Sequence, residues 1–353
     1  MESCREEVVV SKPEATPVPS PLCQLQENPW GSFSAFGCNM KGNERKLVCL
    51  TGGNSYLGSH ILKHLLARGY LVRLALQNPV EVEEIMNLKG MEVGLERVVL
   101  AKFVDVGSLG RAFTGCDAVF HTSSFDPRGV SGYSETMAFL ETEVARNVIE
   151  ACGRAASVKR CIFTSSLLAS IWQSNGGADG VIDESCWSDE EFCRYNKLWL
   201  ALGKTTAEKI AWRKSKEMKI NLVTVCPGLL MAPTFPNAHT EAFLPYVKGG
   251  QLMLEQGVLA TVNVNTAAKA HVDVYEAMDH GACGRYFCFD KVVKRLDEVI
   301  ELENGLKMQG LLSRGRHAVS NNEEEEEERH CSLSNARLAK LVSYACQPLS
   351  CKQ

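Results

Sequence analysis

Short apolar runs alternate with helical stripes of apolar residues through most of the chain. The apolar runs have the length of buried strands and cover residues 47–50, 71–76, 98–104, 118–121, 160–164 and 222–226. Elsewhere apolar residues recur at spacings of three and four, which predicts helices at 56–66, 81–88, 108–113, 133–152, 201–216 and 333–344. Strands that alternate with helices in this way predict an α/β fold, a doubly wound parallel sheet with helices on both faces.

A glycine turn links the first predicted strand to the first predicted helix. It reads T-G-G-N-S-Y-L-G-S, with Gly52 and Gly58 at the outer positions of G-x-x-G-x-x-G and Ser55 at the middle one. In a Rossmann-type sheet, such a turn brings a pyrophosphate to the N–H groups at the helix N-terminus. A middle glycine permits closer approach than a serine, so the turn alone leaves both a nucleotide site and an ordinary βα turn open.

Ligands of doubly wound sheets bind where the strands end at their carboxyl side. We therefore expect the glycine turn and the strand ends to hold a cofactor. The candidates from the turn are Gly52, Gly53, Ser55, Tyr56, Leu57 and Gly58. The candidates from the later strand ends are Gln77, Asp105, Val106, Thr122, Ser123, Ser165, Pro227 and Gly228.

The two ends of the chain differ in composition from its middle. Four prolines among Ser, Thr and Glu predict a disordered extension over residues 1–45. The unbroken glutamates at 323–328 predict a solvated, disordered loop over 319–330 rather than a metal site. We expect an NAD(P)-binding domain of Rossmann type over 46–230 and a smaller C-terminal substrate lobe over 231–353.

Composition excludes several classes of partner. The formal net charge is −4 without a basic stripe, which argues against nucleic acid, and the apolar runs are too short to span a bilayer. The 15 cysteines lack paired C-x-x-C spacing and the 8 histidines lack metal-ligand spacing. No N-terminal signal peptide is evident, and an acidic N-terminus supports a plastid transit peptide poorly. We therefore expect reduced thiols, a cytoplasmic location and no metal.

Five segments occur in order: T-G-G-x-x-Y-L-G-S, C-D-x-V-F-H-T, F-T-S-S, D-E-S-C-W-S-D and G-K-x-x-A-E-K-x-A-W. Together they resemble the extended short-chain dehydrogenases/reductases, and more narrowly the plant cinnamoyl-CoA reductase and dihydroflavonol reductase group. The resemblance covers residues 46–290 and, more weakly, the tail. It implies an NAD(P)-dependent oxidoreductase, monomeric or homodimeric, acting on a small phenolic or acyl-thioester substrate.

The resemblance also implies a catalytic Ser, Tyr and Lys. In that family the Tyr protonates the carbonyl oxygen, while the Ser donates a hydrogen bond to the same oxygen. The Lys holds the nicotinamide ribose and lowers the pKa of the Tyr. Carried over, the Ser is Ser166 and the Lys is Lys204, which also contacts the cofactor. The Tyr position, four residues before Lys204, is Leu200.

Leucine has no proton to give, and a positioned general acid contributes roughly 10²–10⁴ in rate. Tyr195 lies nine residues before Lys204, so it does not share the helix face of Lys204. Two interpretations stay open. One is a reductase with impaired chemistry, and the other is a pseudoreductase that binds nucleotide as a sensor or interaction protein.

The second strand bears on the choice of cofactor. The family ends this strand with an Arg that pairs with the 2′-phosphate of NADP, whereas this chain has Gln77 there and Arg73 within the strand. No Asp or Glu takes that place, so NAD(H) is not indicated either. We expect NADP(H) rather than NAD(H). Phe235, Phe243 and Tyr246 suit an aromatic ligand, but a core needs aromatic residues as well.

Overall fold

The structure is a computed structural model that describes residues 45–86, 94–122, 133–173, 180–231, 249–294, 298–302, 304 and 331–345. Of the predicted extension, residues 1–44 lie outside the described residues, as does all of the acidic loop at 319–330. Phe235, Phe243, Tyr246 and the candidate Ser123 also lie outside them.

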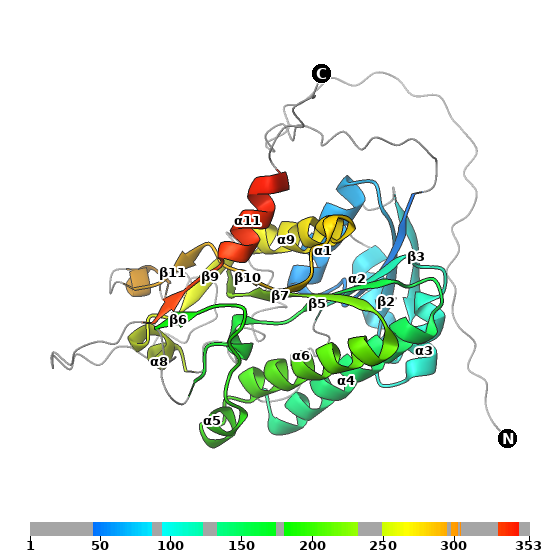
Figure 1. Cartoon of the computed structure of the whole chain (residues 1–353). Helices are drawn as coiled ribbons and strands as arrows, with labels where there is room; N and C mark the ends of the chain where they lie inside the picture. The colour runs from blue at the N-terminus through cyan, green and yellow to red at the C-terminus, as the bar shows by residue number, and fades with distance from the viewer. Residues whose placement is uncertain are drawn as a thin grey trace, which may run out of the picture.

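A seven-stranded sheet forms the centre of the molecule, with the strand order β10-β7-β5-β4-β1-β2-β3 (Figure 1). Every neighbouring pair of strands is parallel. The strands are β1 (Leu47–Thr51), β2 (Leu71–Leu76), β3 (Leu95–Leu100), β4 (Ala118–His121), β5 (Arg160–Thr164), β7 (Asn221–Pro227) and β10 (Gly284–Cys288). The chain order reverses between β1 and β4, which is where such sheets bind ligands. The predicted Rossmann-type fold is confirmed.

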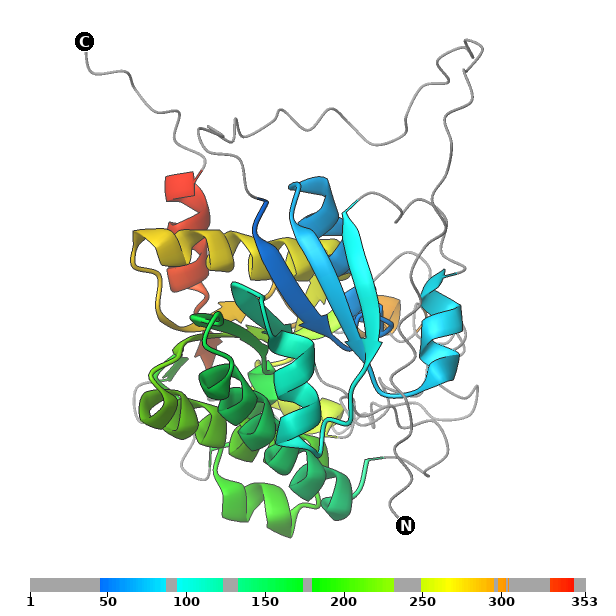
Figure 2. The same ribbon diagram turned by 90° about the vertical axis from the view of Figure 1, so that its right-hand side faces the viewer.

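Helices cover both faces of this sheet. Figure 1 shows α1, α9 and α11 on one face, and α3, α4 and α6 on the other. Figure 2, turned by 90°, shows the yellow and red helices α9 and α11 above the green helices α4 and α6. Their bounds are α1 (Tyr56–Ala67), α3 (Val106–Phe113), α4 (Glu135–Arg154), α6 (Trp199–Met218), α9 (Val264–Ala277) and α11 (Ala336–Ala345).

The side chains of β1 alternate between the two layers, as successive residues of a strand do. Val48 and Leu50 join the core that contains α1 and α9, whereas Cys49 joins the core that contains α3, α4 and α6. All three side chains are fully buried. Because both faces of β1 are covered, its sequence is a continuous apolar run rather than an alternating one.

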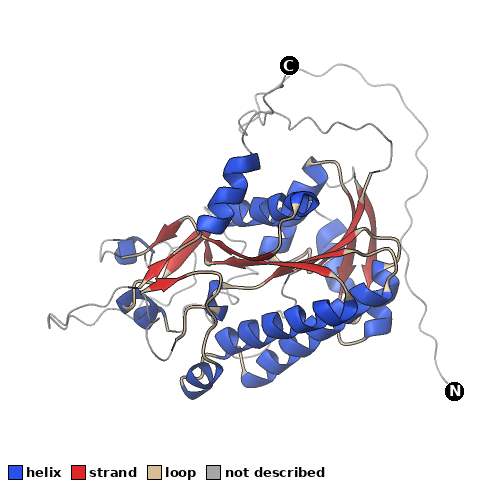
Figure 3. Cartoon of the chain, viewed as in Figure 1, coloured by secondary structure: helices blue, strands red, loops and turns tan. Residues whose placement is uncertain are grey.

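The smaller elements gather at one end of the main sheet, where Figure 3 shows short strands apart from the long ones. The short strands form a three-stranded sheet, β11-β9-β8, and a pair, β12-β6. They are β6 (Val181–Ile182), β8 (Leu229–Met231), β9 (Ala260–Asn263), β11 (Lys291–Val292) and β12 (Ser332–Leu333). Further helices are α2 (Pro79–Met86), η1 (Leu167–Ala169), α5 (Glu190–Tyr195), α8 (Gly250–Glu255) and η3 (Met278–His280).

Two strands of the main sheet differ from the sequence prediction, and the short strands outside it were not predicted. The predicted strand at 98–104 is wrong in its bounds, since β3 runs from Leu95 to Leu100 and pairs with β2 only that far. Beyond it Phe103 is buried in the core beneath α3, so the apolar run continues after the strand has ended. Strand β10 was not predicted, and it pairs with β7 at the edge of the sheet. The main sheet therefore extends past residue 230, into the part expected to form the smaller lobe.

Candidate functional site

The glycine turn after β1 is closed so tightly that residue 58 has no room for a side chain. Gly52 has a φ of +64°, the left-handed region that favours glycine. A Cβ on Gly58 would lie 2.1 Å from the carbonyl oxygen of Gly52. The hydroxyl of Ser55 accepts a hydrogen bond from the Gly58 N–H at 3.1 Å and so caps α1. Tyr56 and Leu57 are buried in the first turn of α1. The turn thus presents backbone, not side chains, at the helix N-terminus, as a pyrophosphate needs.

The ends of β1 and β4 are joined by two threonine side chains. The Thr122 hydroxyl bonds to the carbonyl oxygens of Thr51 and Gly52, at 2.7 and 3.2 Å. The Thr51 hydroxyl lies 2.7 Å from Nδ1 of His121. Burial, followed by the charge of Lys204, lowers the pKa of His121 to about 3, so this imidazole is neutral. These contacts hold together the carboxyl ends of β1 and β4, the two strands between which the chain order reverses.

The end of β2 carries a carboxylate rather than a cation. The N–H groups of Gln77 and Asn78 donate to Oε2 of Glu81 at 2.8 and 3.4 Å, and the Asn78 side chain donates to Oε1 at 2.9 Å. Arg73 is buried and turned away from this edge, with Nε 2.8 Å from Oε2 of Glu96. A negative charge therefore lies at the end of β2, where the family has an Arg that pairs with the 2′-phosphate of NADP.

The sequence analysis placed Asp105 and Val106 at the end of the third strand. That prediction is wrong, because β3 ends at Leu100. Asp105 caps α3 by accepting from the Gly107 N–H at 2.8 Å, and Val106 is the first residue of the helix. The residues that follow the strand are Ala101 and Lys102, and the Ala101 N–H donates to the Leu76 carbonyl at 2.8 Å. The lysine that interrupts the apolar run was the signal that the strand ends before it.

The adjacent serines after β5 have different partners. The Ser165 hydroxyl donates to Oε2 of Glu208 at 2.6 Å, on the side of α6. The Ser166 hydroxyl instead accepts from the Leu168 N–H at 3.2 Å and caps η1. Ser165 therefore belongs to a structural network, whereas Ser166 stands at the start of a helix that packs against α6.

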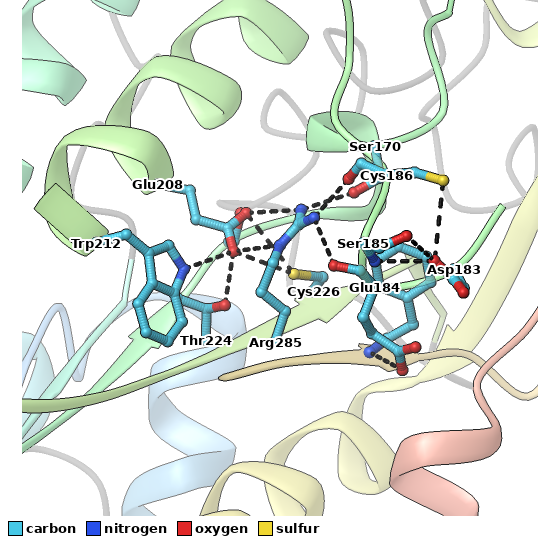
Figure 4. A network of polar contacts seen from close by, with 12 residues as sticks. Ser170, Asp183, Glu184, Ser185, Cys186, Glu208, Trp212, Thr224, Cys226 and Arg285 are labelled. Atoms are coloured by element: carbon cyan, nitrogen blue, oxygen red, sulfur yellow. Dashed lines mark hydrogen bonds and ion pairs between the residues drawn. The ribbon is translucent and has the colours of Figure 1, made fainter. Parts of the chain in front are cut away.

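Glu208 and Arg285 form the centre of that network, which Figure 4 shows in close-up. Oε1 of Glu208 is 2.8 Å from Nε of Arg285 and 2.6 Å from the Thr224 hydroxyl. Arg285 also donates to Ser170 at 2.7 Å, and its guanidinium lies over the Trp187 ring at 3.8 Å. Since both charged groups are buried and bonded on several sides, they hold α6 firmly against β7 and β10.

Lys204, one turn before Glu208 on α6, is paired with a carboxylate from α4. Its Nζ donates to Oε1 of Glu141 at 2.6 Å, and the two side chains are 9% and 8% exposed. The Tyr133 hydroxyl donates to the other oxygen of Glu141. Leu200 is partly buried and packs against the main core. The site thus contains the predicted lysine. Its ammonium group faces the Glu141 carboxylate, and the residue one helical turn before it is Leu200 instead of a tyrosine.

Pro227 and Gly228 end β7 at the same edge. The Gly228 N–H donates to the Cys288 carbonyl at 3.0 Å, and a Cβ on Gly228 would lie 2.6 Å from the Ala260 carbonyl oxygen. The glycine therefore permits the chain to pass between the main sheet and the small sheet. Its N–H group is engaged by the Cys288 carbonyl.

Glu141, Tyr133 and Glu81 were not among the predicted site residues. For Glu141 a signal existed, since it lies on the apolar stripe of Met137, Val144 and Val148, where a charged residue needs a buried partner. The partner itself came from a different helix, and single-sequence periodicity does not give that pairing.

The described residues contain neither a cluster suited to a metal ion nor a helix suited to span a membrane. Among the described residues, no group of three or more His, Cys, Asp and Glu side chains is arranged to hold a metal ion. None of the helices that the structure describes has the length and hydropathy required to cross a membrane.

Comparison with known proteins gives the family. A family model for NAD(P)H-binding proteins matches residues 52–195. Cinnamoyl-CoA reductase 1 of Petunia hybrida is 37% identical over 265 residues, 74% of this chain and 77% of that protein. Tetraketide alpha-pyrone reductase 1 of Arabidopsis thaliana is 32% identical over 72% of this chain and 78% of its own length.

Solved structures agree with this assignment. The crystal structure of vestitone reductase from alfalfa has a TM-score of 0.59 and 25% identity, covering 84% of this chain and 92% of the other. A yeast reductase structure, Gre2, has a TM-score of 0.63 at 16% identity, with 86% and 94% covered, which shows the fold. With its glycine turn, its parallel sheet and relatives at this identity, the chain belongs to the cinnamoyl-CoA reductase-type family of NAD(P)-dependent extended short-chain dehydrogenases/reductases.

Proposed function

We propose that this chain binds a nicotinamide dinucleotide along the carboxyl edge of its sheet and is a slow oxidoreductase for a phenylpropanoid-type aldehyde, acyl thioester or ketone. The observation that carries the proposal is the turn at Gly58, which is shaped for a pyrophosphate at the N-terminus of α1. The phenylpropanoid class of the substrate is inferred from the family relationship. The names of the relatives describe them as reductases of small molecules.

The glycine turn, Ser166 and Leu200 each have a part in this proposal. The bound nicotinamide would supply or accept the hydride. The turn from Gly52 to Gly58 would hold the pyrophosphate, and Ser166 would donate a hydrogen bond to the carbonyl oxygen. Leu200 offers no proton, so the proton comes from water, and the rate falls by up to the roughly 10²–10⁴ that a positioned acid supplies.

For the cofactor we propose that NADP(H) has little advantage over NAD(H). The family resemblance favours NADP(H), but Arg73 is bonded to Glu96, and Glu81 places a negative charge at the end of β2. A 2′-phosphate would meet that charge, whereas the 2′-hydroxyl of NAD(H) could donate a hydrogen bond to it.

A pseudoreductase that binds nucleotide without turnover is the second candidate. Leu200 favours it, and so does the ion pair that Lys204 makes with Glu141. In this case the site would sense the nucleotide or a phenolic ligand. For both candidates we propose a cytoplasmic location, supported by the ten free thiols among the described residues.

Titration of the purified chain with NADPH and with NADH, followed by nicotinamide fluorescence, tests the proposal. Saturable binding of either is the expected result, and a folded chain that binds neither would overturn both candidates. Oxidation of NADPH in the presence of a phenolic aldehyde or an acyl thioester then separates them. Slow but measurable turnover supports the oxidoreductase, and binding without turnover supports the pseudoreductase.

A further inference from the structure

The Glu141 carboxylate is fully engaged inside the site. One oxygen accepts from the Lys204 ammonium at 2.6 Å, and the other accepts from the Tyr133 hydroxyl. Lys204 and Glu141 come from two helices, α6 and α4, that pack along each other (Figure 1). The contact is thus part of a helix–helix interface and is sheltered from water, where opposite charges attract each other more strongly than at the surface.

Gly203 makes room for this arrangement. A Cβ on residue 203 would lie 2.7 Å from the Tyr133 hydroxyl oxygen and 3.0 Å from the Ala138 α-carbon. The absence of a side chain there lets α4 and Tyr133 come close to α6. Leu200, Gly203 and Lys204 therefore lie close together on α6, and of the three only Leu200 departs from the family pattern.

We infer that Glu141 acts as a positioning residue that withdraws Lys204 from cofactor binding and proton transfer by holding its ammonium group in a buried ion pair. This inference rests on the proposed function, because it concerns the same site. A lysine beside a tyrosine favours the ionised phenol, but an adjacent carboxylate offsets that charge. The missing hydroxyl at residue 200 is therefore one of two defects, and restoring it alone leaves the second in place.

Tyr133 does not replace the missing acid. Burial and the neighbouring Glu141 raise the pKa of Tyr133 well above its usual value, which makes it a weaker proton donor. Its hydroxyl hydrogen is already directed at Glu141. His121 faces the same charges and is neutral, so it does not change the balance between Lys204 and Glu141.

The test is a double-mutant cycle of Leu200→Tyr and Glu141→Gln in the full chain, with the phenol titrated by its ultraviolet absorbance against the parent. In the Leu200→Tyr variant, we expect the introduced phenol to keep a pKa near or above the ordinary value of about 10. In the double variant, it should fall by about one unit or more, since Lys204 is no longer offset. Glu143→Gln is the matched control, because Glu143 is on α4 and pairs with Arg146 instead.

An equal phenol pKa with Glu141 and with Gln at residue 141 would overturn the inference. If the chain binds nucleotide, equal turnover by the single and double variants would also overturn it, because we expect the double variant to be about tenfold faster. The phenol titration needs no cofactor, so it decides the inference even if the chain binds no nucleotide. Failure to bind a nucleotide would overturn the proposed function but not this inference.

The unaltered chain gives a second measurement in case Glu141→Gln prevents folding. Labelling with an amine reagent, read by mass spectrometry, should leave Lys204 unmodified both with and without NADPH, because the ion pair already protects it. Lys209, whose side chain is 41% exposed, is the internal control and should be labelled. Labelling of Lys204 that NADPH then prevents would overturn the inference.

Discussion

Gly58 and Gly52 are so close that a Cβ on Gly58 would lie 2.1 Å from the Gly52 carbonyl oxygen. The Gly58→Ala substitution must therefore open the turn that would hold the pyrophosphate. We expect nucleotide affinity to fall at least tenfold, measured by nicotinamide fluorescence. Gly110→Ala is the control, because a Cβ on Gly110 would meet no atom within 4 Å. Equal affinity in the two variants would place the nucleotide elsewhere.

Glu81 should control the choice between the two cofactors. The Glu81→Gln substitution keeps a hydrogen-bond acceptor for the Gln77 and Asn78 N–H groups but removes the charge. We expect NADPH to bind several-fold more tightly, with NADH unchanged or weaker, since a like charge next to a phosphate is removed. The ratio of the two dissociation constants at low salt is the measurement. Glu83→Gln, on the same helix, should leave this ratio unchanged.

Glu208 should contribute strongly to the stability of the fold. The Glu208→Gln substitution leaves the buried Arg285 without its counter-charge, and losing one partner of a buried pair costs about 3–5 kcal/mol. The free energy of unfolding in urea gives the test. Glu150→Gln removes an acid from a surface pair with Arg154 and should cost less than about 1 kcal/mol. A loss of similar size in both variants would contradict the structural role of the network.

Protonation of His271 should make the free energy of unfolding depend on pH. Its Nε2 lies 2.9 Å from the Thr164 hydroxyl and its Nδ1 2.7 Å from the Ala267 carbonyl oxygen. Burial lowers the pKa of His271 from 6.5 to about 4 in the folded chain, so the unfolded chain binds a proton first. Stability is therefore lost as the pH falls from about 6.5 to about 4, by on the order of 3 kcal/mol in total.

The measurement for His271 is the melting temperature over that pH window. The His271→Gln variant lacks the titrating group and should show a smaller fall in melting temperature between neutral and acid conditions. A fall as large as that of the unaltered chain would assign the acid sensitivity to other groups, such as His121, whose pKa is also lowered.

The parts of the fold that depend on local pattern were predictable from the sequence. Strand β1 and helix α1 follow from one apolar run, a glycine turn and a helical stripe. The end of β3 was not predictable in this way, because Phe103 continues the apolar pattern while packing in a core outside the strand. Strand β10 contains Arg285, a charged residue whose burial depends on Glu208, which lies far away in the sequence.

The candidate site also combines residues that the sequence indicated with contacts that only the structure shows. The family resemblance indicated Ser166, Leu200 and Lys204 as positions of the site. The roles of their neighbours needed three-dimensional contacts: Ser165 turns to Glu208, Arg73 turns to Glu96, and Glu141 meets Lys204 across two helices. Pairings between residues distant in the sequence leave no periodic signal in a single chain.

Helix α6 carries Lys204 and, one turn later, Glu208, and the second of these is fixed by Arg285, Thr224 and Ser165. These contacts hold the helix against the main sheet, and they involve neither Leu200 nor Lys204. A lineage of such proteins can lose turnover at residue 200 without weakening the architecture around it. The nucleotide site that we propose can then outlast the reaction, and a new or regained role can begin from it.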